Sequence, residues 1–195
     1  MTKAESKVID FIKKHILLYL LVAVTIIAIF LRVCGMDFQS DDFNSFLNSW
    51  WSIIKLNDFT GLATQVGNYN IPYQIIIYLM TLFPLNALYA YKIVSIIFDF
   101  VLAISTAMLV YSFAKNNRRL KAILTYSAIL LSATVIFNSS FWAQCDSIYT
   151  SFIILAILFL HKDKPIASFV FIGIAFAFKL QTVFIIPVLL YYWIS

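Results

Sequence analysis

Long apolar runs separated by short polar stretches decide what this chain can fold into. They cover residues 16–33, 71–83, 88–114, 120–137, 148–160 and 166–194. Only 12% of the residues are charged and 63% are hydrophobic, with a mean hydropathy of +0.92, whereas a soluble domain carries roughly 25% charged residues. The sequence therefore predicts an all-α, polytopic transmembrane helix bundle in which residues 1–195 form a single membrane domain.

Positive charges set the predicted orientation. Lysine and arginine gather in short clusters at 3–14, 115–121 and 162–164. Basic loops favour the cytoplasmic side, and all three clusters reach that side only if the run 71–83 does not span. That run is also short for a crossing, which needs about 20 residues. We therefore predict a cytoplasmic amino terminus and about 5–6 spans, and we interpret the clusters as topology signals, with no nucleic acid as a partner.

The first apolar run has two competing interpretations. Lys13 and Lys14 precede it, as in a signal peptide. However, the run is longer than the usual core of about 7–15 residues, and residues 32–37 form a poor cleavage site. We predict that it is retained as the first span of an integral membrane protein.

A long outer loop, residues 36–87, is expected between the first two spans. Within it, 42–56 carries apolar residues at helical spacing, so we predict an amphipathic helix lying flat on the outer surface. A second juxtamembrane helix is predicted over 71–83, bounded by Pro72 and Pro84. The expected apolar face of the first helix consists of Phe43, Phe46, Leu47, Trp50, Ile53 and Ile54.

Two acidic segments follow apolar runs and fall on the same outer face in this topology. Asp41 and Asp42 come after the first span, and Asp146 comes after the third. Carboxylates near hydrocarbon cost about 2.5–3.5 kcal/mol, so acids retained there usually face a cavity, a partner or a substrate. Each could equally cap the helix that follows it. The sequence leaves both interpretations open.

Two further charges lie inside apolar runs. Asp99 is in the middle of the second expected span and needs a partner, either a buried structural pair or a hydrogen bond to Ser95 or to a Ser or Thr on another helix. Lys179 falls in the outer half of the bilayer. Either the helix breaks there and residues 182–194 turn back, or one long helix carries Lys179 inside the bundle. Its ammonium either snorkels to the interface or is held for a phosphate.

Four segments in order resemble the GT-C class of integral-membrane glycosyltransferases, and more closely bacterial mannosyltransferase-like proteins related to the GPI second-mannose transferases. Residues 138–149, NSSFWAQCDSIY, resemble their W-G-Q-x-D-S segment, with Ala143 in place of the usual Gly. Residues 68–73, NYNIPY, resemble their N-Y-x-P-P-Y segment, with Ile71 in place of the first Pro. The resemblance covers nearly the whole chain. Two further stretches match in kind, 91–99 and 178–181.

This resemblance implies transfer of a mannose-like hexose from a polyprenyl-phosphate donor to a lipid-linked or cell-surface glycan acceptor at the outer face of a bacterial plasma membrane. A general base must take the acceptor's proton, and Asp42 or its neighbour Asp41 suits that role. Asp146 would orient the acceptor or donor sugar, or help hold a divalent ion if one is used. Lys179, with Arg32 as the second choice, would stabilise the leaving phosphate. The other residues expected to bind substrate are Gln144, Trp142 and Gln181.

Several questions remain open on the sequence. Proteins of the GT-C class are considerably longer, so we expect residues 1–195 to be the amino-terminal part of one membrane module. No metal site is indicated, although the resemblance does not decide whether a divalent cation is used. The alternatives are an inactive fragment of the transferase, or a non-catalytic transporter or complex subunit in which Asp99 and Lys179 serve a pathway or helix pairing. Cys34 and Cys145 are expected to be ordinary thiols.

Overall fold

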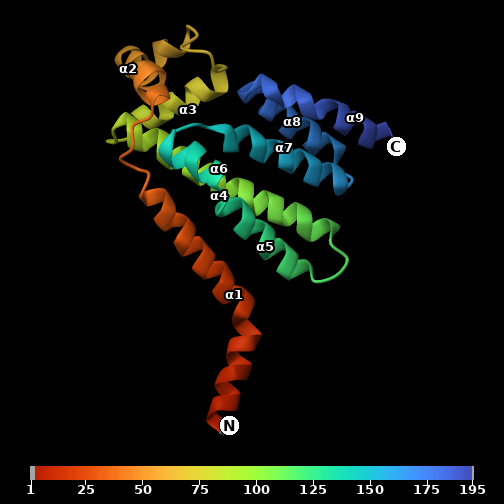
Figure 1. The fold of residues 1–195 in the computed structure, drawn as a ribbon. Helices are drawn as coiled ribbons and strands as arrows, with labels where there is room; N and C mark the ends of the chain where they lie inside the picture. The colour runs from red at the N-terminus through yellow and green to blue at the C-terminus, as the bar shows by residue number, and fades with distance from the viewer. Residues whose placement is uncertain (1–2, 195) are drawn as a thin grey trace.

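The structure, a computed structural model, describes residues 3–194, and these are all helices and connecting loops without a strand. The all-α prediction is confirmed for this part of the chain (Figure 1). The helices in order are α1 (Lys3–Val33), a π-turn η1 (Phe43–Leu47), α2 (Asn48–Asn57), a 3-10 turn η2 (Asp58–Leu62), α3 (Ile71–Thr81), α4 (Ala87–Phe113), α5 (Arg118–Leu130), α6 (Ala133–Ile136), a π-turn η3 (Phe137–Phe141), α7 (Asp146–His161), α8 (Pro165–Phe178), a 3-10 turn η4 (Leu180–Ile185) and α9 (Ile186–Ile194).

Two helices in the described part are long and apolar enough to cross a membrane: His15–Val33 within α1, and α4. A third candidate is α5 together with 133–141, if this pair with its 50° bend forms one span. These helices give the chain membrane-protein character. Helices α7 and α8, with 16 and 14 residues, are shorter than the roughly 20 residues of a full crossing. A bundle of five or six spans therefore stays a prediction, as does the orientation.

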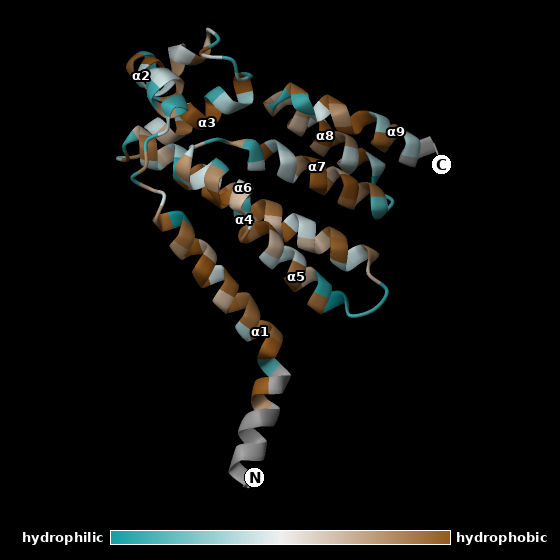
Figure 2. Cartoon of the chain, viewed as in Figure 1, coloured by the Kyte–Doolittle hydropathy of each residue, from teal (hydrophilic) through white to brown (hydrophobic). Residues whose placement is uncertain are grey.

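Hydrophobic side chains cover the outward surfaces of the long helices. Figure 2 shows apolar residues along both α1 and α4, and Ile26, Phe30, Ile97 and Ile104 among them are exposed. Exposed apolar rows of this length are rare on soluble proteins. They fit contact with lipid. The side chains of the amino-terminal lysines lie outside the described residues.

Segments η1, α2, η2 and α3 form a cap over one end of the bundle (Figure 1). At this end α1 and α8 finish and α4 and α7 begin. Helix α3 has 11 residues, or about 16 Å at 1.5 Å per residue, which is too short to cross the roughly 30 Å hydrocarbon core. Pro72 lies in its first turn, as expected. Both acidic segments lie at this end of the bundle, which we call the cap end.

The amphipathic helix exists, but its buried face differs from the prediction. Trp51 is buried, whereas Phe46 and Ile53 are 53% and 40% exposed. The π-turn of η1 is the physical reason, because its wider turn rotates the following residues relative to a regular helix. The residues that pack into the core under the cap are Phe43, Leu47, Trp50, Trp51 and Ile54 from this helix, with Tyr73, Ile77, Tyr91, Cys145 and Ile148 from other segments.

The chain breaks at Lys179 and turns back, which is the first of the two alternatives. Helix α8 ends at Phe178, and Lys179 has an extended backbone with φ −149° and ψ 126°. Figure 1 shows α9 returning alongside α8. Pro187 lies in the first turn of α9, a position that proline favours because its missing N–H costs nothing there. Lys179 is therefore placed at the cap end rather than in the bundle interior.

Candidate functional site

The side chain of Gln144 joins the two predicted site segments at the cap end. Its Nε2 donates to Asp42 Oδ2 at 2.8 Å, and its Oε1 accepts from the Tyr69 hydroxyl at 3.0 Å. Burial raises the pKa of Tyr69, so the phenol stays protonated and acts as the donor. Residues 102 positions apart in the sequence are thus linked directly. The amide orientation follows, since a carboxylate accepts hydrogen bonds and needs the NH₂.

An ion pair between Lys179 Nζ and Asp146 Oδ1 forms the second half of the site. Asp146 Oδ2 also accepts from Asn138 Nδ2 at 3.0 Å. The ammonium lies 5.6 Å from the ring centroid of Tyr69 and 5.4 Å from that of Tyr149, within the range of a cation–π interaction. Tyr69 therefore contacts both halves, and a polar chain runs from Asp42 to Asp146.

Neither predicted acid caps a helix with its side chain. The backbone N–H of Phe43 donates to Ser40 Oγ at 3.1 Å, so Ser40 performs the capping role before η1. Asp42 makes no capping bond. Asp146 is the first residue of α7, where its charge suits the helix dipole, but the residue before it makes no side-chain cap. The capping interpretations were wrong, because Asp42 bonds to Gln144 and Asp146 bonds to Lys179 instead.

The two hydrogen-bond partners of Gln144, Asp42 and Tyr69, line different cavities. The first, about 340 Å³, is lined by Phe38, Gln39, Ser40, Asp41, Asp42 and Trp142. The second, about 580 Å³, is lined by Asn68, Tyr69, Asn70, Phe178, Lys179, Leu180, Gln181, Val183 and Phe184. The predicted residues Asp41, Asp42 and Trp142 thus face one cavity. Lys179 and Gln181 face the other, with Asp146 bonded to Lys179.

Arg32 is not brought to this site. Its guanidinium is buried and donates from Nε to Asp99 Oδ2 at 2.9 Å, and from Nη1 to the carbonyls of Ala28 and Leu130. This geometry corrects the expectation that Arg32 could hold a phosphate, because a buried ion pair costs several kcal/mol to separate. The prediction of a buried partner for Asp99 is confirmed. Sequence reasoning gave no signal for Arg32 as that partner.

Three residues of the site escaped prediction. Tyr69, Asn138 and Tyr149 lie within the two segments that carry the family resemblance, and that resemblance was the only available signal for them.

The described residues contain no group of three or more His, Cys, Asp or Glu side chains that could hold a metal ion. Comparisons with known protein families, with curated proteins and with solved structures found no match.

The buried thiol of Cys145 offers a pH-dependent probe of the site. Both cysteines are free; Cys34 is exposed and Cys145 buried. Burial raises the pKa of the Cys145 thiol to about 11, and only the thiolate reacts. In a Cys34→Ser background, we expect slow alkylation at pH 8 and a rise of about tenfold per pH unit up to pH 10. The measurement is the alkylation rate by mass spectrometry, with denatured protein as the control. A rate that is flat between these pH values would contradict the burial.

Proposed function

We propose that this chain carries the catalytic site of a membrane glycosyltransferase that moves a mannose-like hexose from a polyprenyl-phosphate donor to a lipid-linked or cell-surface glycan acceptor. The observation that carries the proposal is the polar chain from Asp42 through Gln144 and Tyr69 to Lys179. An oriented carboxylate stands at one end of this chain and a cation at the other. These are the two groups that a transfer from a sugar phosphate requires.

Asp42 is the general base in this proposal. It is exposed, and Gln144 donates to Oδ2, so Oδ1 is left to accept the proton of an acceptor hydroxyl. As the acceptor oxygen bonds to the anomeric carbon of the donor, its proton passes to the Asp42 carboxylate. The bond between the anomeric carbon and the phosphate oxygen breaks, and its electron pair leaves with the lipid phosphate.

Lys179 is the group that meets the leaving phosphate. An ammonium has three protons to donate, and Asp146 accepts from it on one side. The other side faces the larger cavity, where a phosphate oxygen can bind. Asp146 then keeps the ammonium in place and accepts hydrogen bonds from sugar hydroxyls. Electrostatic stabilisation of this kind is worth about 10²–10³ in rate when one donor is lost.

The lining of the larger cavity favours a lipid-linked donor. Leu180 and Phe184, which line it together with Lys179, are 61% and 80% exposed. Apolar side chains beside a cation suit a molecule that has a phosphate head and a prenyl tail. The prenyl chain would lie along this apolar edge while its phosphate contacts Lys179.

A transporter or complex subunit has less support. An ion pathway needs its charges to face water or a cavity, but Asp99 is fully buried and accepts from Arg32, Ser139 and Ser147. Lys179 is paired with Asp146 beside an open cavity. The polar groups therefore fit a binding site at one end of the bundle better than a route through it.

Reconstitution tests the proposal. We expect the full chain, in liposomes with polyprenyl-phosphate mannose and a lipid-linked glycan, to form a product that carries one more hexose, detected by mass spectrometry. Asp146→Asn should lower the rate about 100-fold, because Lys179 loses its charged partner. Asp58→Asn is the matched control, since Asp58 is exposed and lines neither cavity. Absence of product with every hexose donor, or an unchanged rate for Asp146→Asn, would reject the assignment.

A further inference from the structure

Helix α4 carries two buried charges on one face. Lys92 and Asp99 are both fully buried and seven residues apart, which is about 10 Å along the helix axis at 1.5 Å per residue. Neither residue lines a cavity at the cap end. Buried charges are costly unless they are fully paired, so what each of them bonds to is informative.

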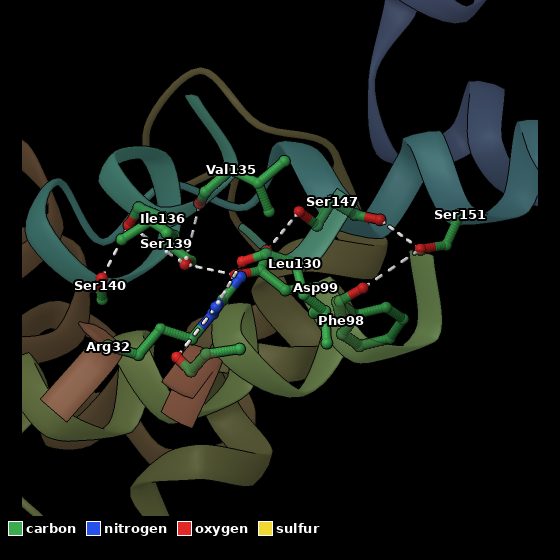
Figure 3. Close-up of polar contacts among 11 residues, drawn as sticks. Arg32, Phe98, Asp99, Leu130, Val135, Ile136, Ser139, Ser140, Ser147 and Ser151 are labelled. Carbon is green, nitrogen blue, oxygen red and sulfur yellow. Dashed lines mark hydrogen bonds and ion pairs between the residues drawn. The ribbon is translucent and has the colours of Figure 1, made fainter. Parts of the chain in front are cut away.

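Asp99 bonds to both ends of the segment that carries Gln144 and Asp146 (Figure 3). The hydroxyl of Ser139 donates to Oδ2 at 2.5 Å, and that of Ser147 donates to Oδ1 at 2.6 Å. These serines flank the connection between η3 and α7. Ser139 follows Asn138, which donates to Asp146, and Ser147 directly follows Asp146. One carboxylate therefore anchors the segment on both sides of the site residues.

The connection between these anchors contains a strained residue. Ala143 has φ 57° and is fully buried, a left-handed conformation that alanine rarely adopts. Such a conformation persists only when the surroundings hold it. Backbone hydrogen bonds from Trp142 to the Phe137 carbonyl at 2.9 Å and from Gln144 to the Asn138 carbonyl at 2.8 Å hold Ala143 directly. The two hydrogen bonds to Asp99 fix the segment further out, at Ser139 and Ser147.

Lys92 bonds to the segment that leads to Asp42. Its Nζ donates to the carbonyls of Gly35 at 2.7 Å and Met36 at 3.0 Å, and to that of Phe38. All three ammonium protons are thus used. The chain from α1 to Asp42 is therefore fixed to α4 only a few residues before the carboxylate.

We propose that α4 positions the two halves of the candidate site, with Asp99 fixing the segment of Gln144 and Asp146, and Lys92 fixing the approach to Asp42. Both are positioning residues, because they act through the segments they hold. Their effect on sugar transfer rests on the proposed function, whereas the holding of the segments does not.

The reactivity of Cys145 tests the Asp99 half, because this buried thiol lies between Gln144 and Asp146. In a Cys34→Ser background, Ser147→Ala is expected to raise the alkylation rate at pH 8 at least tenfold, as is Asp99→Asn. Ser105→Ala is the matched control, since Ser105 is also buried and donates to a carbonyl of its own helix at 3.0 Å. Its rate should stay within twofold of the parent.

The same experiment distinguishes local loosening from unfolding. The melting temperature in detergent is measured for each variant, and Ser147→Thr, which retains the hydroxyl, should return the rate to the parent value. If Asp99→Asn does not fold, Ser139→Ala and Ser147→Ala carry the test. Folded forms of both serine variants with the parent rate would overturn the assignment of Asp99.

A spin label tests the Lys92 half. Gln39 is exposed between Phe38 and Ser40, so a nitroxide on Gln39→Cys, in a Cys34→Ser, Cys145→Ser background, reports the mobility of this segment. Lys92→Met is expected to increase that mobility, while Lys121→Met, an exposed lysine on α5, should leave it unchanged. Equal spectra for the two variants would overturn the assignment of Lys92.

The alkylation rate and the spin-label mobility separate the two proposals, because neither measurement depends on sugar transfer. A chain that responds to Ser147→Ala and Lys92→Met but transfers no sugar would retain the positioning role and lose the proposed function. A chain that transfers sugar but shows no change in thiol reactivity or mobility would retain the proposed function and lose the positioning role. If both proposals hold, Ser147→Ala should also lower transfer about tenfold at saturating donor.

Discussion

Asp42→Asn is expected to lower the rate of hexose transfer by about 10²–10⁴-fold, the usual contribution of a general base. The amide has nearly the same shape as the carboxylate and can still accept a hydrogen bond from Gln144 Nε2, which donates to Asp42 at 2.8 Å. What is lost is the basicity that takes up the acceptor's proton. Initial rates in liposomes with the polyprenyl-phosphate donor measure the effect.

Asp41→Asn is the informative comparison for this variant. Asp41 is exposed and lines the same cavity as Asp42, but the structure describes no hydrogen bond that orients its carboxylate. We therefore expect a rate within about threefold of wild type, as for a change outside the proton transfer. A large loss for Asp41→Asn with a normal rate for Asp42→Asn would move the base to Asp41. Normal rates for both would remove general-base catalysis by this segment.

Arg32→Met is expected to destabilise the fold by about 3–5 kcal/mol, because it leaves the buried carboxylate of Asp99 without its charged partner. The pair is almost inaccessible to solvent, with side-chain exposures of 1% and 0% and an N–O distance of 2.9 Å. Thermal unfolding in mild detergent, followed by near-UV circular dichroism, measures the loss.

Two further variants control this prediction. Arg32→Met combined with Asp99→Asn should recover part of the stability, since the uncompensated charge is removed. Arg118→Met changes an exposed arginine that donates to the Tyr111 carbonyl at 2.9 Å, and surface changes of this kind cost at most about 0.5 kcal/mol. Equal stability of Arg32→Met and Arg118→Met would show that the buried pair is not needed to hold α1 against α4.

The sequence was most informative where local physics decides the outcome. A backbone in lipid must satisfy its own hydrogen bonds, so long apolar runs can only become helices, and α1 and α4 formed where those runs lie. Pro72 marked the start of α3 for a local reason as well, because proline suits a first helical turn. The 71–83 run is short, and the helix that forms there, α3, has only 11 residues.

The composition of the candidate site could be predicted only in part. Asp42, Gln144, Asp146 and Lys179 were expected, and the structure joins them in two pairs, by a hydrogen bond and by an ion pair. Tyr69, which contacts both halves, was not expected. A tyrosine in a loop carries no local mark of its partners, since Gln144 comes from the loop before α7 and Lys179 from the break between α8 and η4, after the chain has folded back.

The sequence by itself determined that this chain forms apolar helices with acids retained near their ends, because hydropathy and charge are properties of each residue. Only the tertiary structure decided which charges meet. Arg32 lies at the end of a span, a position that suggested a residue facing the site. In the structure it pairs instead with Asp99, 67 positions away. Such a partner depends on how α1 packs against α4 and α5, and the free energy of pairing a buried charge depends on that packing rather than on sequence spacing.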